Sequence, residues 1–320
     1  MVEQVTMHHK KDGEAALIVG SMAIDSVRTP LGEVEDKLGG AAVYSSMAAS
    51  FFSPVRLVGV VGEDFPEDAL QMLANRGVDL EGVQKAAGKT FRWKGYYDYD
   101  LNQAHSLSTE LNVFEQFSPN LPEAYRQSKY VMLANIDPDL QLSVLDQVNH
   151  PRLTLCDTMN YWISSKKERL LDVFRRVNVV IINDGEARQL FETFSLVHAA
   201  DAIRALGPQT VIIKKGEHGA TMFHHDTVFT APSFPLRTIM DPTGAGDTFA
   251  GGFIGYLARC GELTEAAMRR AVVYGSVLAS FNIEDFGVER MRRLHLHEVR
   301  ARFRELRHIS YFEEIDDLPL

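Results

Sequence analysis

The sequence predicts an α/β protein in which helices cover both faces of a mostly parallel central sheet. Two observations predict this class: short, nearly continuous apolar runs recur along the chain, and helical patterns separate them. A strand that is apolar throughout is typical of a parallel sheet buried on both faces, whereas a strand with one wet face alternates between apolar and polar residues. Alternation of such strands with helices favours a layered α/β architecture.

Six runs are expected to form central strands, because each is short and rich in β-branched or aliphatic residues. In chain order they are ALIVG, VRLVGVVG, KYVMLANI, RLTLC, VNVVIIN and TVIIKKG. The patterns predict helices at FPEDALQMLANRG, which ends at Gly77, at PDLQLSVLDQVN, at residues 245–259 and at TEAAMRRAVVYGSVLASF.

Two segments depart from the alternation of apolar strands and helices. They are expected to pair as a small β lid, formed by about residues 24–37 and 89–115. Both alternate in polarity, and the second is dense in aromatic residues. If its strand is unbroken at Gly95, alternation puts four aromatic side chains on one face. They are Phe91, Trp93, Tyr97 and Tyr99. That face is expected to cover a ligand, to form a dimer contact or to be the apolar core of the lid.

Composition limits the function classes. The chain has 320 residues with a formal net charge of −10, which argues against a general nucleic-acid binder because such proteins need a basic face. Its two cysteines, Cys156 and Cys260, form neither a disulfide framework nor a zinc cluster, and Cys156 is expected to be a buried thiol. No apolar stretch approaches the roughly 20 residues of a membrane span. Without a secretory signal, the expected location is cytoplasmic.

The stretch DPTGAGDTFAGGF, which starts at Asp241, carries the strongest chemical signal. A helix N-terminus presents free N–H groups that favour an anion, and glycines let those groups approach it closely. Residues 244–246 therefore predict an anion hole, with Asp247 in the first helical turn. A carboxylate beside a bound phosphate is suited to take the proton from an attacking hydroxyl.

The same stretch resembles the C-terminal signature of the ribokinase-like (PfkB) carbohydrate and nucleoside kinases. LGGAAVYSSMAAS resembles the N-terminal signature, NDGEARQL the Asn-x-x-Glu motif, and IIKKGEHGA the strand and turn that border the nucleotide. The order of these motifs agrees with the family over about residues 16–290. The resemblance implies a three-layer α/β/α sandwich with a small β lid. We expect a tail at residues 1–14, a kinase domain at 15–305 and a second tail at 306–320.

The resemblance also implies roles for residues around the phosphates. Asp247 would be the catalytic base, and the amides of Gly244, Ala245 and Gly246 would stabilise the transferring phosphoryl group. Glu186, with Asn183, would order Mg²⁺ and its waters, and Asp241 would lie at a monovalent-cation (K⁺) site. The remaining residues expected at the ATP site are Lys214, Gly216, Gly219, Thr243 and Asn282.

The acceptor pocket is expected to differ from that of most sugar kinases in the family. They carry asparagine four residues after the second glycine of the Gly-Gly pair, whereas this chain has Tyr44, and a phenol does not reproduce a carboxamide's paired donor and acceptor. The resemblance makes Asp25 the residue that binds acceptor hydroxyls. The other expected acceptor contacts are Gly39, Gly40, Tyr44, Asn135 and Asn160.

The function expected from the sequence is therefore an ATP-dependent kinase that phosphorylates a hydroxyl of a small sugar or polyol. A nucleoside kinase of the same family and a non-catalytic ligand-binding regulator on the same fold are the alternatives. Because lids of this family often pair between subunits, a homodimer through the lid is also expected.

Overall fold

The computed structural model describes residues 13–312. In this part of the chain one large sheet has the strand order β13-β12-β11-β10-β9-β8-β1-β4-β5. These strands are β1 (Ala16–Val19), β4 (Val55–Val61), β5 (Val78–Lys85), β8 (Tyr130–Leu133), β9 (Leu153–Cys156), β10 (Val179–Asn183), β11 (Thr210–Lys214), β12 (Ala220–His224) and β13 (Thr227–Ala231). Neighbouring strands are parallel from β11 to β5, and β12 and β13 add an antiparallel edge.

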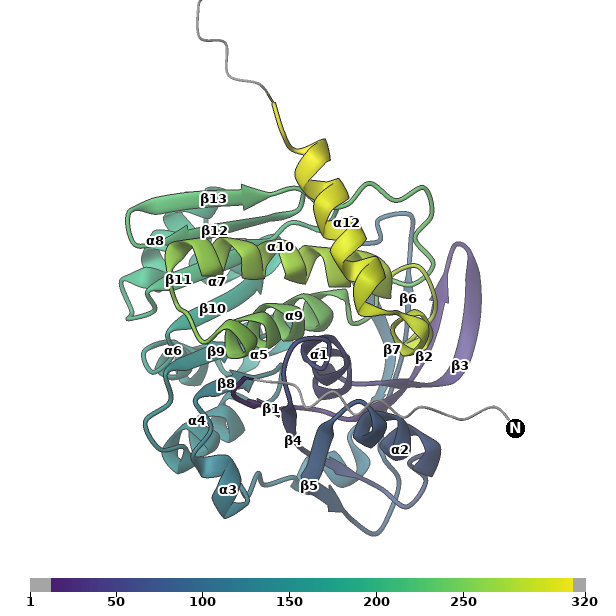
Figure 1. Ribbon diagram of the computed structural model, residues 1–320. Coiled ribbons are helices and arrows are strands. Elements are labelled where there is room, and N and C mark those ends of the chain that lie inside the picture. The colour runs from purple at the N-terminus through teal and green to yellow at the C-terminus, as the bar shows by residue number, and fades with distance from the viewer. Residues whose placement is uncertain (1–12, 313–320) are drawn as a thin grey trace, which may run out of the picture.

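Helices cover both faces of this sheet, so the molecule has three layers (Figure 1). The front layer in that view contains α1 (Ala41–Ala49), α2 (Glu67–Asn75), α9 (Ala245–Cys260), α10 (Glu265–Asn282), α11 (Glu289–Arg293) and α12 (Leu296–Ile309). The back layer contains α3 (Glu123–Arg126), α4 (Pro138–Gln147), α5 (Asn160–Ser165), α6 (Lys167–Phe174), α7 (Asp184–Phe191) and α8 (Leu196–Arg204). Two short 3₁₀ helices are η1 (Asn112–Gln116) and η2 (Gly216–His218).

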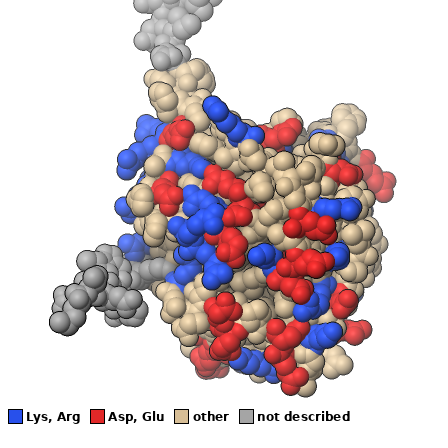
Figure 2. Space-filling model, turned by 90° about the vertical axis from the view of Figure 1, so that its right-hand side faces the viewer, with Lys and Arg blue, Asp and Glu red and all other residues tan. Residues whose placement is uncertain are grey.

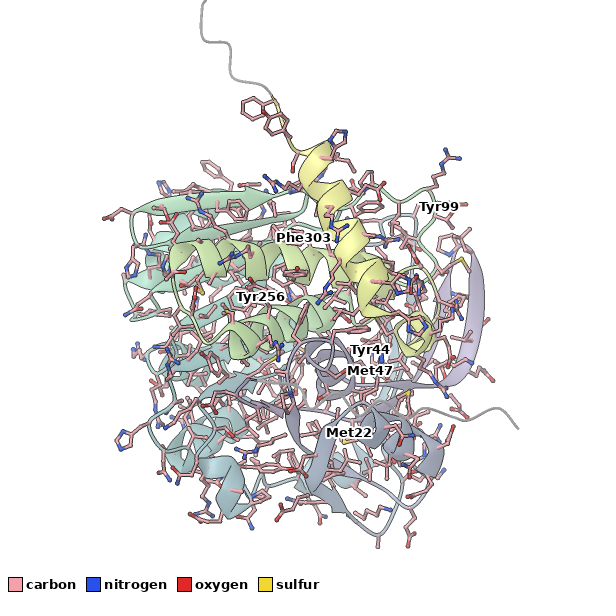
Figure 3. The ribbon with its side chains drawn as sticks, in the orientation of Figure 1. Met22, Tyr44, Met47, Tyr99, Tyr256 and Phe303 are labelled. Atoms are coloured by element: carbon pink, nitrogen blue, oxygen red, sulfur yellow. The ribbon has the colours of Figure 1, made fainter. Side chains whose placement is uncertain are left out.

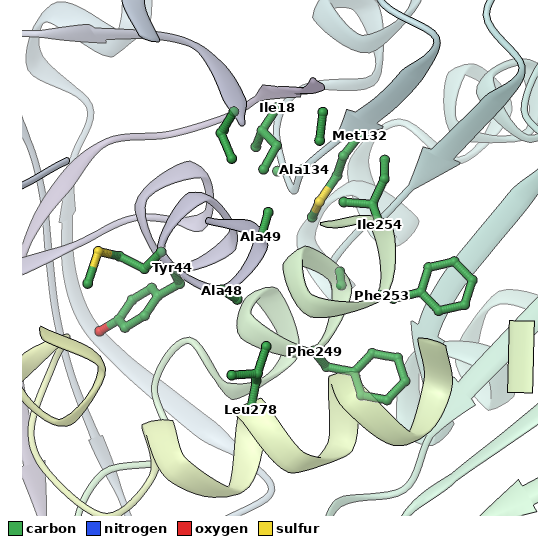
Figure 4. Packing of buried hydrophobic residues seen from close by; sticks show 14 of the residues in the cluster. Ile18, Tyr44, Ala48, Ala49, Met132, Ala134, Phe249, Phe253, Ile254 and Leu278 are labelled. Carbon is green, nitrogen blue, oxygen red and sulfur yellow. The ribbon is translucent and has the colours of Figure 1, made fainter. Parts of the chain in front are cut away.

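The central strands are mostly apolar because both faces of the sheet are buried. On β1, Ile18 packs into the cluster beneath α1 and α9, whereas Leu17 and Val19 pack into the cluster beneath the opposite helices. All three side chains have no exposed surface. Figure 4 shows the first cluster, in which Phe249 of α9 lies near Leu278 of α10. This arrangement confirms the predicted fold class.

A second sheet of four strands forms the lid, in the order β3-β2-β6-β7. Its strands are β2 (Ala23–Thr29), β3 (Gly32–Gly39), β6 (Phe91–Tyr97) and β7 (Ala104–Glu110). The pairing of β2 with β6 is parallel and unbroken through Gly95, so Phe91, Trp93 and Tyr97 share one face, as alternation predicts. Tyr99 does not join them, because β6 ends at Tyr97, and its side chain is 94% exposed (Figure 3).

The sequence analysis missed three strands of the main sheet: β5, β12 and β13. Strands β5 and β13 lie at the two edges of the sheet, and each is only partly buried, so neither shows a continuous apolar run. Strand β12 is buried, but its sequence ATMFH is short and follows a glycine-rich turn. These strands extend the sheet without changing the predicted layers.

The chain end also differs from the prediction. The expected tail at 306–320 begins inside α12, which continues through Ile309. Val299, Phe303 and Leu306 form one apolar stripe of this helix at helical spacing, and Leu306 is 1% exposed. At the other end, residues 1–12 of the expected tail lie outside the described residues, and the Glu14 amide donates to the carbonyl of Ala258.

Charged side chains of both signs are interspersed on the face shown in Figure 2. Among the described residues, no helix is both long and apolar enough to cross a membrane.

Candidate active site

The glycine turn before α9 forms the floor of the candidate active site. Gly244 has φ 73°, a left-handed conformation that glycine adopts without strain, and it is the N-cap of α9. The amide of Thr248 donates to the Gly244 carbonyl at 2.8 Å, which starts the helix directly after the turn. The Ala245 amide donates to the Pro242 carbonyl at 3.2 Å, so the anion hole predicted at residues 244–246 depends on the amides of Gly244 and Gly246.

Asp247 lies in this first turn among other charged groups. Burial and the nearby Asp157 charge raise the pKa of Asp247 to about 7, although Lys214 acts in the opposite direction. Its backbone carbonyl accepts a hydrogen bond from Ser45 on α1 at 3.0 Å, which fixes the start of α9 against that helix. A carboxylate with a pKa near neutrality suits a general base, since it can both take and release a proton.

Lys214 and Asp157 form a buried ion pair beside the glycine turn. The Lys214 ammonium donates to both Asp157 oxygens, at 3.3 and 3.2 Å. A methyl group added to Gly246 would lie 2.8 Å from Lys214 Nζ, so the ammonium lies directly against the anion hole. Burial lowers the pKa of Lys214, but the charges of Asp157, Glu186 and Asp247 outweigh it, so the pKa is raised and Lys214 stays cationic.

Asn183 and Glu186 start α7 as a capping box. The Glu186 amide donates to Asn183 Oδ1 at 2.7 Å, and Glu186 Oε2 accepts from the Asn183 amide at 2.8 Å. Burial raises the pKa of Glu186 to about 8, with Lys214 opposing the shift and Asp157 adding to it. Both residues therefore have a local structural role, and Glu186 also shares the electrostatic environment of Lys214 and Asp247.

Asp241 joins two loops below the glycine turn. One carboxylate oxygen accepts from the Thr243 amide at 2.9 Å and the other from the Gly287 amide at 3.0 Å. Asn282 Nδ2 donates to the Thr243 carbonyl at 2.8 Å, while Asn282 Oδ1 is buried without a hydrogen-bond partner in the described structure. An oxygen that is buried and unsatisfied is costly, which makes it a candidate cation ligand.

Asp25 faces the site from the lid rather than from the end of β1. It is the third residue of β2, 5% exposed, and burial together with the charge of Asp241 raises its pKa to about 8, although the Gly40 amide donates to it. A side chain at Gly39 would overlap this carboxylate, and Gly40 has φ 96° at the N-cap of α1. Gly39 is therefore required because the Asp25 carboxylate approaches it closely, and Gly40 is required because of its positive φ.

Tyr44 lies between the acceptor side of the site and the glycine turn. Its ring lies against Gly244, where any added side chain would overlap it, and its hydroxyl is buried without a hydrogen-bond partner among the described residues. In Figure 4 the hydroxyl points away from the apolar cluster around Ala48 and Ala49. Burial raises the pKa of Tyr44, and so do the nearby charges of Asp241 and Asp25. The phenol is therefore a neutral hydrogen-bonding group at this site.

The lid covers the site with the face that carries Asp25. Strand pairing places Trp93 beside Asp25, and the Trp93 indole donates to Ser106 at 2.9 Å. Farther along the same face, Tyr97 accepts from Thr243 at 3.4 Å, which links the lid to the loop before the glycine turn. The neighbouring residues Arg92 and Lys94, which the alternation places on the opposite face, pair with acids.

The lid also reaches the turn expected to border the nucleotide. Gly216 has φ 53°, and a side chain there would overlap the carboxamide of Asn102 in the loop between β6 and β7. Gly219 has φ 77°, and a side chain there would overlap the Ala231 carbonyl, so this glycine permits the tight crossing of β13. The lid therefore spans the distance between the Asp25 side of the site and the Gly216 turn.

Two predicted acceptor residues, Asn135 and Asn160, bond to other side chains in the described structure. Asn135 Oδ1 accepts from the Trp162 indole at 3.0 Å, and Asn160 Nδ2 donates to Gln189 on α7 at 2.6 Å from an exposed position. The residue that the prediction missed is Asp157. It directly follows β9, and its place at the carboxyl end of a parallel strand was the available signal.

The fold and this site define a class of protein: an α/β phosphotransferase with a glycine turn at a helix N-terminus and a carboxylate beside it. The chain belongs to the PfkB family of carbohydrate kinases, whose model matches residues 14–292, which confirms the resemblance drawn from the motifs. It is 31% identical over 256 residues to a cytidine kinase of Thermococcus kodakarensis, over 78% of this chain and 90% of that one.

Two further relatives have different acceptors in their names. The chain is 26% identical over 274 residues to a ribokinase of Lactococcus lactis, over 84% of this chain and 86% of that one. A nucleoside kinase of Burkholderia thailandensis, solved in complex with ADP-inosine, superposes with a TM-score of 0.73 at 19% identity, over 96% of this chain and 99% of that one.

The raised pKa values predict how activity depends on pH. A base with a pKa of about 7 is ionised only above that pH, and Asp25, with a pKa of about 8, becomes a full charged acceptor in the same range. We expect kcat/KM to rise with pH between about 6 and 9 and then level off, because this ratio reports groups of the free enzyme and Asp25 is only half ionised at a pH equal to its pKa of about 8. The measurement is a pH–rate profile with the Mg·ATP concentration held constant. A profile that stays flat down to pH 5 would contradict it.

Proposed function

We propose that this kinase transfers the γ-phosphoryl group of ATP to a hydroxyl of a small polyol bound between Asp25 and Asp247. The observation that carries the proposal is the meeting of Asp247, Lys214 and the Gly244–Gly246 turn in one site beneath the lid. Such a site combines a base, a fixed cation and free amides at the place where negative charge develops during phosphoryl transfer.

In this mechanism Asp25 accepts hydrogen bonds from acceptor hydroxyls, and Asp247 takes the proton from the hydroxyl that attacks. The amides of Gly244 and Gly246 donate to the transferring phosphoryl group, whereas that of Ala245 donates to the Pro242 carbonyl, and Lys214 adds a positive charge beside the turn. The Gly216 turn, with Gly219, Thr243 and Asn282 near it, borders the nucleotide. Closure of the lid, which bears Tyr97, excludes water as a competing acceptor.

Glu186 and Asn183 fit an Mg²⁺ site of the outer-sphere kind, because Mg²⁺ retains several waters that the buried Glu186 carboxylate and the half-buried Asn183 carboxamide can orient. The metal supplies charge neutralisation on the phosphates. Asn282 Oδ1 fits a K⁺ site at the Asp241 loop, because it is a buried acceptor without a partner in the described structure. Asp241 would stabilise that site mainly by fixing the two loops.

A nucleoside is the acceptor class that the relatives favour. The relatives include a cytidine kinase at 31% identity, and the ligand of the Burkholderia structure contains inosine. Trp93 on the site-facing side of the lid offers an aromatic surface on which a base can stack. A free sugar, the acceptor expected from the sequence, is the second candidate, favoured by the ribokinase relative.

A screen of turnover separates the two acceptor classes. We expect saturable Mg·ATP-dependent phosphorylation of a nucleoside, with kcat/KM at least about tenfold above that for ribose, because a bound base adds contacts equivalent to at least about 1.4 kcal/mol. The screen compares cytidine, inosine, adenosine, ribose, fructose and myo-inositol by ADP release. Turnover of free sugars alone would overturn the nucleoside proposal. ATP binding without turnover of any acceptor would favour the regulator.

The homodimer and the cellular location expected from the sequence remain part of the proposal. A homodimer through the lid would use β3 or β7, whose outer edges are unpaired in the described structure. A cytoplasmic location agrees with the use of ATP.

A further inference from the structure

Lys214 reaches across the sheet to its ion-pair partner. It is the last residue of β11, and Asp157 directly follows β9, with β10 lying between the two strands. The ammonium nevertheless bonds both Asp157 oxygens, and only 17% of the Lys214 side chain and 5% of the Asp157 side chain is exposed. The pair therefore crosses the end of β10, directly above Asn183.

The surrounding backbone holds Asp157 in one place. Its amide donates to the Leu133 carbonyl at 3.0 Å, and its carbonyl accepts from Gln141 at 3.0 Å. The Thr158 amide donates to Asp157 Oδ1 at 2.9 Å, which orients the carboxylate. In contrast, Lys214 has a flexible four-carbon stem, so the carboxylate is the fixed partner and the ammonium is the group that it positions.

Two other carboxylates compete for the same ammonium. Glu186 and Asp247 both attract Lys214 electrostatically, whereas its hydrogen bonds within the described chain go to Asp157. If Lys214 paired with Asp247, the carboxylate would be a weaker proton acceptor. In the described structure the hydrogen bonds of the ammonium go to Asp157 instead.

We infer that Asp157 is a positioning residue that holds the Lys214 ammonium against the Gly246 amide turn and away from Asp247. This inference rests on the proposed kinase function. The pair keeps a cation at the phosphate side of the site while Asp247 remains free to accept a proton. The contribution of Asp157 is made through Lys214, so it should disappear when Lys214 is removed.

A double-mutant cycle tests the inference with Asp157→Asn, Lys214→Met and the combined variant. We expect Asp157→Asn to lower kcat by about tenfold with the acceptor KM within twofold of the parent, because small displacements of a catalytic group are costly. In the Lys214→Met background, Asp157→Asn should change kcat by less than twofold. Equal fold losses in both backgrounds would overturn the inference, since independent sites are additive.

Controls separate positioning from folding and from failure of the proposed function. Asp139→Asn removes a carboxylate from a surface pair with Lys166 and should leave kcat unchanged. Melting temperatures identify variants that fail to fold, and Asp157→Glu should recover part of the activity. If the parent lacks turnover, the proposed function fails, and the same cycle is measured by the Kd for ATP. Non-additivity in Kd would support the Asp157–Lys214 coupling, and additivity would overturn it.

Discussion

Replacing Asp247 with asparagine is expected to lower kcat by at least about 10²-fold while the Kd for ATP stays within about twofold of the parent. A positioned general base contributes about 10²- to 10⁴-fold, and an amide cannot accept the proton. ATP binding should persist because the amides of residues 244–246 and the Lys214 ammonium remain in place. The two quantities therefore separate loss of the base from loss of the nucleotide site.

The measurements are steady-state ADP release at saturating acceptor and a calorimetric titration with ATP. Asp201→Asn is a matched control, because it removes a carboxylate from the exposed surface of α8, where Asp201 pairs with Arg204. Parent-like kcat in the Asp247→Asn protein would remove Asp247 from the mechanism. A large loss of ATP affinity would instead assign Asp247 to the binding of the nucleotide or its metal.

The geometry of the glycine turn and of the start of α7 was predictable because its signals are local in sequence. Gly244, Gly246 and Asp247 lie within four residues, and one helix N-terminus fixes their geometry. Asn183 and Glu186 likewise lie in one helical turn, and their spacing is that of a capping box. In both cases the structure places the residues where a single turn of backbone requires them to be.

The remaining features depend on contacts between distant segments, which no local pattern encodes. The Asp157–Lys214 pair joins residues 57 positions apart across an intervening strand. The contact between Tyr97 and Thr243 depends on how the lid folds over the sheet. The hydrogen bond from the Trp162 indole of α5 to the carboxamide oxygen of Asn135 likewise joins two distant segments. Residue type alone does not predict which distant side chains these residues contact.

Replacing Asp25 with alanine is expected to lower kcat/KM for the acceptor by about 10²- to 10⁴-fold. In the proposed complex this carboxylate accepts two hydroxyl hydrogen bonds, and bonds to a charged group contribute roughly 1.5–3 kcal/mol each. Their joint loss of about 3–6 kcal/mol corresponds to that range at about 1.4 kcal/mol per factor of ten. The Kd for ATP should not change. The control is Glu33→Ala, which removes an exposed carboxylate from β3 of the same lid.

Stability measurements on the Asp25→Ala protein test independently whether Asp25 is buried and protonated in the free enzyme. The folded-state pKa of Asp25 is about 8, far above its unfolded value, so the protonated group stabilises the fold at low pH. That contribution is lost as pH rises from about 4 to about 8, because ionising a buried carboxylate is costly. The parent's melting temperature should therefore fall more between pH 5 and pH 8 than that of Asp25→Ala. If the melting temperatures of parent and variant changed in parallel with pH, Asp25 would already be ionised or solvated in the free enzyme. In the kinetic experiment, a parent-like kcat/KM of Asp25→Ala would exclude Asp25 from the acceptor site.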